Sequence, residues 1–208
     1  NPVLWFDLMS QLEVNWTIAP DFSYRLVARK FKEAQQRKKF VPKIDLSYIV
    51  SMQNAAEPIR QSTKELMDET FSAFGLNEDS FDPAYGLAET CVYASDLREY
   101  RLSQFQPTKG QSLIAIGNRN TMPQEQTVKI VCPINNKEMN DGEVGELWLS
   151  GPSVTAGYFG KPELTQKVFQ AKMIGYNQPF LRTGDQAFFE ENYLFICGRL
   201  KDLVIVNG

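Results

Sequence analysis

Residues 180–208 have the sequence FLRTGDQAFFEENYLFICGRLKDLVIVNG, in which two charged segments separate apolar runs. We predict turns at Arg182–Asp185 and Gly198–Asp202, because glycine next to polar residues favours a turn. The carboxylate of Asp185 could accept two hydroxyl hydrogen bonds, as a ribose diol would offer. The guanidinium of Arg199 could reach a phosphate or the same sugar. Either segment alone fits an ordinary solvated turn equally well, so the choice depends on the rest of the chain.

The C-terminal half of the chain contains several short runs that are rich in β-branched and aromatic residues. Strands at this spacing indicate a small barrel or sandwich. One helix, at about residues 162–171, interrupts the series. The predicted strands are Leu113–Ile116, Thr127–Val131, Glu146–Leu149, Gln186–Phe189, Tyr193–Cys197 and Leu203–Val206.

The N-terminal half alternates helices and strands, which is typical of a doubly wound α/β lobe with a parallel sheet. Ligands of such lobes bind beyond the carboxyl ends of the strands. We place the change of pattern between residues 96 and 110, and expect an α/β lobe at 1–110 and a β-rich, barrel-like lobe at 111–208. The predicted elements are a helix in Pro2–Asn15, a strand at Asn15–Ile18, a helix at Phe22–Gln36, a strand at Leu46–Met52, a helix from Pro58 to Phe74 that Gly75 stops, and a strand at Phe81–Tyr85.

Composition excludes several classes of function. The 208 residues carry a net charge of −3, which gives no electrostatic footprint for nucleic acid. No apolar run approaches the length of a membrane span. Histidine is absent, so Ser-His and Cys-His catalysis are excluded within this segment. The three cysteines lack the spacing of a zinc site or a disulfide framework, which favours a reducing cytoplasm.

Four motifs occur in a fixed order along the chain. They are YGLAET at 85–90, GELWLSGPSVTAGYF at 145–159, FLRTGD at 180–185 and GRLKDLVIVNG at 198–208. Together they resemble the adenylate-forming superfamily, and within it most closely the fatty-acyl-AMP ligases. Four ordered motifs are far more specific than a single glycine-rich match.

The resemblance implies roles for the residues around the first motif. Glu89 matches the acidic residue that holds magnesium and would be the catalytic carboxylate, since a hard cation prefers oxygen ligands. Tyr85, with Gly86 beside it, matches the aromatic residue that packs against adenine. The alternatives are a glutamate at a helix N-terminus for Glu89 and a half-buried core tyrosine for Tyr85. The other adenine wall would be the small-residue turn Ala55, Ala56, Glu57 and Pro58.

The later motifs resemble the sugar and phosphate contacts of the same superfamily. Asp185 matches the ribose-binding aspartate, and Arg199 matches the arginine that contacts ribose or phosphate. Lys201 matches the hinge to a small C-terminal lobe. We interpret Gly151, Gly157 and Tyr158 as structural, and Asp21–Tyr24 resembles the region that flanks the acyl tunnel. We expect Tyr85, Ala56, Glu89, Asp185 and Arg199 to line one cleft.

The implied activity joins a fatty acid to AMP from ATP, with Mg²⁺ as the metal, and passes the acyl group to a carrier-protein thiol. One departure is Ala88, which stands where many members of the superfamily have a threonine that contacts phosphate. A long segment between Cys91 and Ala115 is similar to the insertion that hinders transfer to CoA. An acyl-CoA synthetase and a non-catalytic binding module of the same fold remain alternatives.

The resemblance covers only the middle of such an enzyme. The phosphate-binding loop and the C-terminal lobe of the superfamily match nothing in this chain, so we expect a fragment of a larger enzyme. Because backbone dipoles of that loop would stabilise the transferred phosphate, we expect the isolated fragment to be inactive.

Overall fold

A computed structural model describes residues 1–37, 43–104 and 112–200. These residues form two compact units. The first, called the α/β unit, comprises Asn1–Ala84 and Asp96–Arg101; the second, called the β unit, comprises Tyr85–Ser95 and the residues from Leu102 onward. The YGLAET motif therefore belongs to the β unit. The predicted lobe boundary after residue 110 lies outside the described residues and stays a prediction.

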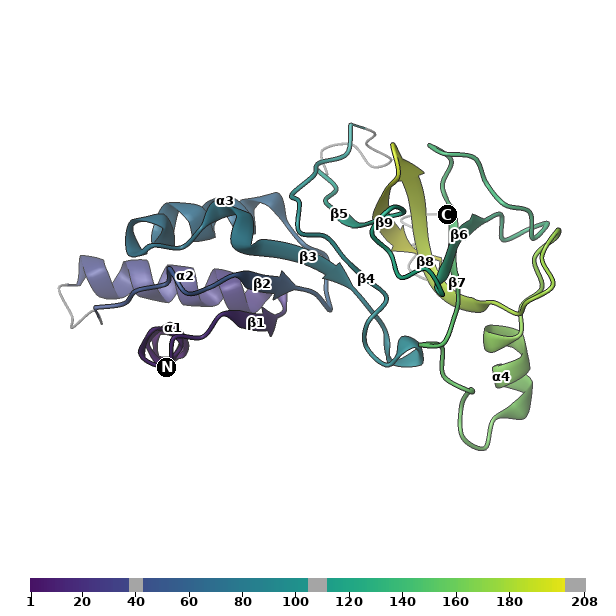
Figure 1. Cartoon of the computed structure of the whole chain (residues 1–208), viewed down its shortest axis with the longest axis horizontal. Helices are drawn as coiled ribbons and strands as arrows, with labels where there is room; N and C mark the ends of the chain where they lie inside the picture. Colours follow the sequence, from purple (N-terminus) through teal and green to yellow (C-terminus); the bar gives the residue numbers. More distant parts are fainter. Residues whose placement is uncertain (38–42, 105–111, 201–208) are drawn as a thin grey trace, which may run out of the picture. The chain divides into compact units, whose positions relative to one another are not determined.

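The α/β unit alternates helices with short strands (Figure 1). The strands form one sheet in the order β1-β2-β3-β4, in which β2 pairs in parallel with both β1 and β3. This confirms the predicted α/β class with a parallel sheet. The elements are α1 (Pro2–Gln11), β1 (Trp16–Ala19), α2 (Asp21–Gln36), β2 (Ser51–Asn54), α3 (Gln61–Phe71), β3 (Phe81–Tyr85) and β4 (Ser95–Asp96).

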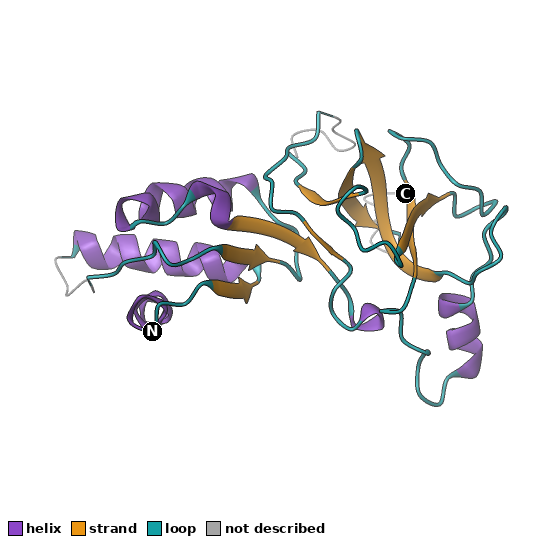
Figure 2. Cartoon of the chain, viewed as in Figure 1, coloured by secondary structure: helices purple, strands orange, loops and turns teal. Residues whose placement is uncertain are grey.

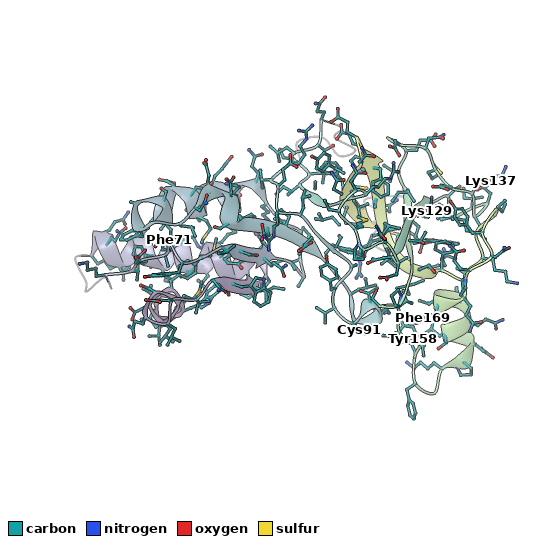
Figure 3. The ribbon with its side chains drawn as sticks, in the orientation of Figure 1. Phe71, Cys91, Lys129, Lys137, Tyr158 and Phe169 are labelled. Atoms are coloured by element: carbon teal, nitrogen blue, oxygen red, sulfur yellow. The ribbon has the colours of Figure 1, made fainter. Side chains whose placement is uncertain are left out.

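The core of the α/β unit is built from the apolar stripes of its helices. Phe71 of α3, labelled in Figure 3, stacks on Phe6 of α1 with ring centroids 4.7 Å apart and contacts Phe31 of α2 at 5.0 Å. All three rings are fully buried. Burying a large apolar side chain contributes about 1.5–3 kcal/mol, so this aromatic cluster ties the three helices together.

Two boundaries in the α/β unit differ from the prediction. The apolar run Leu46–Met52 is not one strand, because β2 begins only at Ser51. Leu46 and Ile49 are buried as expected, but they belong to a turn in which the Ile49 amide donates to the Leu46 carbonyl. Pro58 is not in the first turn of α3, whose N-cap is Arg60. The predicted stop at Gly75 is confirmed, with a left-handed φ of 85°.

The β unit contains one five-stranded antiparallel sheet in the order β5-β9-β8-β7-β6. Its strands are among those drawn in orange in Figure 2. Its interior includes the fully buried Trp148 and the stacked rings of Phe188 and Phe195. All five strands were predicted, four with shifts of at most two residues at their ends, whereas β8 begins five residues earlier than predicted. The elements are β5 (Ala115–Asn118), β6 (Thr127–Val131), β7 (Gly145–Ser150), α4 (Pro162–Phe169), β8 (Leu181–Glu190) and β9 (Tyr193–Arg199).

The first charged segment was predicted as a turn, and this was wrong. Arg182–Asp185 lies inside β8, and Arg199 is the last residue of β9. In the second segment, Gly198 and Arg199 belong to β9, Leu200 is in a turn as predicted, and Lys201 and Asp202 lie outside the described residues. Asp185 and Arg199 are direct cross-strand partners in the β8–β9 pair. The turn between these strands is instead formed by Glu191 and Asn192, both of which have positive φ values, 51° and 77°. The predicted strand Leu203–Val206 and the hinge at Lys201 lie outside the described residues.

The described helices include none that is long and apolar enough to cross a membrane.

Candidate functional site

Three of the predicted nucleotide-binding residues meet in the β unit. The hydroxyl of Tyr85 donates to Oδ2 of Asp185 at 2.5 Å, although the two residues are 100 positions apart in sequence. Arg199 Nε donates to Oδ1 of the same carboxylate at 2.7 Å. Asp185 is 6% exposed, whereas the Arg199 side chain is 62% exposed. The sequence therefore identified residues that the fold brings together.

This arrangement leaves Asp185 able to bind more than these two partners. A carboxylate has about four lone-pair positions, and Tyr85 and Arg199 occupy one on each oxygen. The remaining positions can accept two hydroxyl hydrogen bonds, as a ribose diol requires. Burial, followed by the negative charge of Asp185, raises the pKa of the Tyr85 hydroxyl well above its ordinary value. Tyr85 consequently stays protonated and remains a hydrogen-bond donor at physiological pH.

The backbone before Asp185 is shaped by a buried glutamate that the sequence analysis did not single out. Glu146 of β7 is 2% exposed, and its Oε1 accepts from the Gly184 amide at 3.1 Å. Its Oε2 accepts from Arg182 Nε and Nη2 at 2.9 and 2.7 Å and from Trp148 Nε1 at 2.9 Å. Gly184 has a left-handed φ of 74°, so Glu146 holds β8 in an irregular conformation directly before the ribose-binding candidate.

Glu146 was missed because its motif was used only for the resemblance. A local signal was available, since a charged residue inside an apolar β-prone run needs a buried partner. The motif FLRTGD supplies that partner in Arg182, 36 residues further along the chain. A charged residue on each of two neighbouring predicted strands could have suggested this ion pair.

Glu89 lies on a tight turn that only glycine permits at its start. It is the middle residue of the 3₁₀ turn η3 (Ala88–Thr90), which follows Gly86. A Cβ at Gly86 would lie 1.4 Å from the carbonyl oxygen of Val92. The amide of Val92 donates to the Leu87 carbonyl, which closes the turn. The alternative of a glutamate at the start of a regular helix does not hold, since η3 has three residues.

The Glu89 carboxylate has a protein partner. The hydroxyl of Tyr158 donates to Glu89 Oε1 at 2.5 Å. This hydrogen bond to Glu89, followed by burial, raises the pKa of Tyr158 to about 12, so the phenol stays a neutral donor at physiological pH.

The donor set around Glu89 fits magnesium only in combination with a substrate. Among the residues that the structure describes, no group of three or more His, Cys, Asp or Glu side chains could hold a metal ion. Magnesium is commonly bound by one or two carboxylates together with water and substrate phosphates rather than by an all-protein cage. A single glutamate therefore suits a metal that arrives with a nucleotide.

The predicted adenine wall lies in the α/β unit. Ala56 has a positive φ of 71°, which is uncommon for a residue other than glycine. The turn is anchored to the start of α2, where the Phe22 amide donates to the carboxylate of Glu57. The buried Asp21 accepts from Asn54 Nδ2 at 3.0 Å and from the Arg60 amide at 3.1 Å. Asp21, considered earlier for the acyl tunnel, thus holds both ends of this turn.

The roles of Ala55, Ala56, Glu57 and Pro58 toward adenine stay predictions, as does the role of Lys201 as a hinge.

Comparison with known proteins identifies the family to which the chain belongs. The sequence model of the family described as AMP-binding enzyme matches residues 1–159. The long-chain-fatty-acid–AMP ligase FadD23 of Mycobacterium tuberculosis is 32% identical over 224 residues, which cover 100% of this chain and 38% of that protein. The medium-chain-fatty-acid–[acyl-carrier-protein] ligase JamA of Moorena producens is also 32% identical, over 225 residues that cover 100% of this chain and 37% of that protein.

A solved structure supports the same assignment. The fatty acyl-adenylate ligase from Legionella pneumophila, in complex with acyl adenylate and pyrophosphate, superposes with a TM-score of 0.85 at 31% identity. The match covers 99% of this chain and 38% of that one. The chain thus spans well under half the length of the relatives it matches. Because the family model matches most of its residues, the chain belongs to the AMP-binding enzyme family.

Proposed function

We propose that the whole protein is an ATP-dependent fatty acid–AMP ligase. In this reaction a carboxylate oxygen of the fatty acid attacks the α-phosphorus of ATP, the bond to the bridging oxygen breaks, and pyrophosphate leaves. The observation that carries the proposal is the convergence of Tyr85, Asp185 and Arg199, which places a carboxylate suited to a ribose diol next to a guanidinium. The functions named for FadD23, JamA and the Legionella enzyme agree with it.

Each residue of the site has a proposed task. Asp185 accepts the two ribose hydroxyl groups, Tyr85 fixes that carboxylate and lies along the base, and Arg199 neutralises Asp185 and reaches the sugar or a phosphate. Glu89 is the ligand for a magnesium ion, which when bound offsets the negative charge of the phosphates. Gly86 and the turn of Ala55, Ala56, Glu57 and Pro58 allow the backbone to approach a flat base. Phosphoryl-type transfers depend mainly on such positioning and charge stabilisation.

The acceptor of the acyl group is proposed to be a carrier-protein thiol. Its sulfur attacks the acyl carbonyl carbon, and AMP leaves with the electron pair of the anhydride bond. The activity named for JamA supports this acceptor. Cys91, Cys132 and Cys197 are all free thiols, which supports a reducing cytoplasm as the place of the reaction.

The proposal is tested with the whole protein, a fatty acid, ATP and magnesium. We expect fatty-acid-dependent exchange of labelled pyrophosphate into ATP, and a fatty acyl-adenylate in the quenched mixture. Addition of a carrier protein bearing its phosphopantetheine thiol should release AMP faster than addition of CoA. Faster release with CoA would identify an acyl-CoA synthetase, and the absence of any exchange would identify a non-catalytic binding module.

A further inference from the structure

A loop of the β unit donates two hydrogen bonds to Glu89. From this loop, which connects β7 to α4, the Tyr158 hydroxyl donates to the Glu89 carboxylate, 69 residues away in sequence. The Thr155 amide of the same loop donates to the Glu89 main-chain carbonyl at 2.9 Å. Side chain and backbone of Glu89 are therefore both held by residues that lie outside its own motif.

Tyr158 is itself held in place by contacts with α4. Its amide donates to Oγ1 of Thr165 at 2.9 Å, and its ring packs edge-on against Phe169 with centroids 5.0 Å apart (Figure 3). Phe169 is buried. Gly157 has a φ of 135°, and a Cβ there would lie 2.1 Å from Thr165 Cγ2. The close contact between loop and helix therefore sets the position of the phenol independently of Glu89.

A neutral donor on a metal-binding carboxylate has a specific physical effect. It restricts the rotation of the Glu89 side chain, which is only partly buried, and it occupies one lone-pair position while leaving the negative charge unchanged. Partners that orient a metal ligand in this way are worth about 10- to 100-fold in metal affinity. The alternative is that Tyr158 only packs the loop on α4, and in that case its hydroxyl would be dispensable.

We propose that Tyr158 is a positioning residue for Glu89, whose hydroxyl holds the carboxylate in the conformation that binds the divalent cation of the metal–nucleotide complex. This inference rests on the proposed function. It changes the interpretation of Tyr158 from a structural residue to a part of the metal site.

The test compares Tyr158→Phe with the wild-type whole protein. Phenylalanine keeps the ring and its contact with Phe169 and removes only the hydroxyl. Mn²⁺ serves as the probe, titrated by electron paramagnetic resonance in the presence of saturating α,β-methylene-ATP. We expect about tenfold weaker Mn²⁺ binding in the variant, with unchanged binding of the nucleotide analogue in the absence of metal.

A matched control is available in the same unit. Tyr176 also donates its hydroxyl to a glutamate, Glu138 Oε2 at 2.8 Å, and neither residue belongs to the proposed site. Tyr176→Phe should leave Mn²⁺ binding unchanged. In a double-mutant cycle, Tyr158→Phe should cause little additional loss when Glu89 is already Gln, because its effect passes through that carboxylate.

Turnover provides an independent measurement. The Mg²⁺ concentration for half-maximal rate should rise about tenfold in Tyr158→Phe, whereas the rate at saturating Mg²⁺ should recover most of its wild-type value. Wild-type Mn²⁺ affinity in the variant, with its melting temperature unchanged, would overturn the inference while leaving the ligase proposal intact. Metal-independent pyrophosphate exchange by the wild type would overturn the inference and the proposed role of Glu89. No exchange at all would overturn the ligase proposal and the inference with it.

Discussion

Tyr85 and Arg199 each donate a hydrogen bond to one oxygen of the Asp185 carboxylate, and we propose that its remaining lone-pair positions bind a ribose. Asp185→Ala removes two hydrogen bonds to a charged group, each worth roughly 1.5–3 kcal/mol before solvent compensation. We expect at least about a tenfold loss of kcat/KM for ATP, since about 1.4 kcal/mol corresponds to tenfold. Pyrophosphate exchange at a series of ATP concentrations measures it.

The control for this variant is another aspartate that pairs with an arginine. Asp141 accepts from Arg119 Nη1 and Nη2 at 3.0 and 2.6 Å on the surface of the same unit. Asp141→Ala removes an arginine–carboxylate pair without touching the proposed ribose site. If both variants lost the same activity, the effect would come from folding, and the role of Asp185 would be refuted.

A second residue-scale prediction concerns Gly86, where the turn carrying Glu89 begins. Gly86→Ala places a methyl group 1.4 Å from the Val92 carbonyl, so the turn must rebuild and Glu89 must move. We expect loss of most pyrophosphate exchange and destabilisation of about 1–3 kcal/mol, typical of forced overpacking. At Gly198 a Cβ would meet only the end of the Gln186 side chain at 3.4 Å. Gly198→Ala should therefore keep most of the stability that Gly86→Ala loses, and equal denaturation midpoints would contradict the argument.

At the scale of the elements, β7 and β8 are joined by the buried carboxylate of Glu146 as well as by their ladder. Glu146→Gln would place an amide NH₂ group among the donors of Arg182, Trp148 and Gly184. An unsatisfied buried donor or acceptor costs about 1–3 kcal/mol, and we expect a loss of stability in that range. The KM for ATP should rise as well, because Gly184 adjoins Asp185. Urea denaturation and ATP titration of the exchange rate measure the two effects.

Glu138→Gln is the matched change at an exposed position. Glu138 accepts from Lys129 and Tyr176, and its side chain is 39% exposed. Exposed ion pairs contribute at most about 1 kcal/mol, so this variant should change stability little and KM not at all. A loss as large as that of Glu146→Gln would mean that the buried network has no special importance.

The elements that could be predicted are those whose conformation depends only on residues close together in the sequence. The helix stop at Gly75 and the strands of the β unit follow from residues that are neighbours in the chain, and they were predicted. The strand conformation of Arg182–Asp185 could not be predicted, because it depends on Glu146, which lies 36 residues before Arg182. The hydrogen bond from Tyr158 to Glu89 likewise could not be inferred from spacing, since a bond between two loops leaves no periodic trace.

For the molecule as a whole, stability should depend on a buried carboxyl group of the α/β unit. Asp82 of β3 is 2% exposed, accepts a hydrogen bond from Ser51, and has no partner for Oδ1 among the described residues. Burial raises the pKa of Asp82, and the Ser51 hydrogen bond only partly opposes this. The folded state therefore retains the proton to higher pH than the unfolded chain does.

The sign of the pH dependence follows from linkage. Where the folded state binds more protons than the unfolded state, stability falls as pH rises through the interval between the two pKa values. Asp82→Asn removes this titration. The variant should therefore lose less unfolding free energy than the wild type when the pH is raised from 4 to 7. Urea denaturation followed by tryptophan fluorescence measures the change, since Trp5 and Trp16 of this unit contribute to the signal alongside Trp148 of the β unit. Asp79→Asn, at an exposed position of the same unit, should leave the pH dependence as in the wild type.

The two-residue turn of Glu191 and Asn192 has a consequence for how the gene can vary. Because both residues have positive φ, the turn matches the twist of its strands and sets their register. Register in turn places Asp185 opposite Arg199, so a single codon inserted or deleted at this exposed turn would shift one strand against the other and turn alternate side chains to the opposite face. This turn should therefore accept residues that adopt a positive φ readily, such as glycine, asparagine and aspartate, but no change of length.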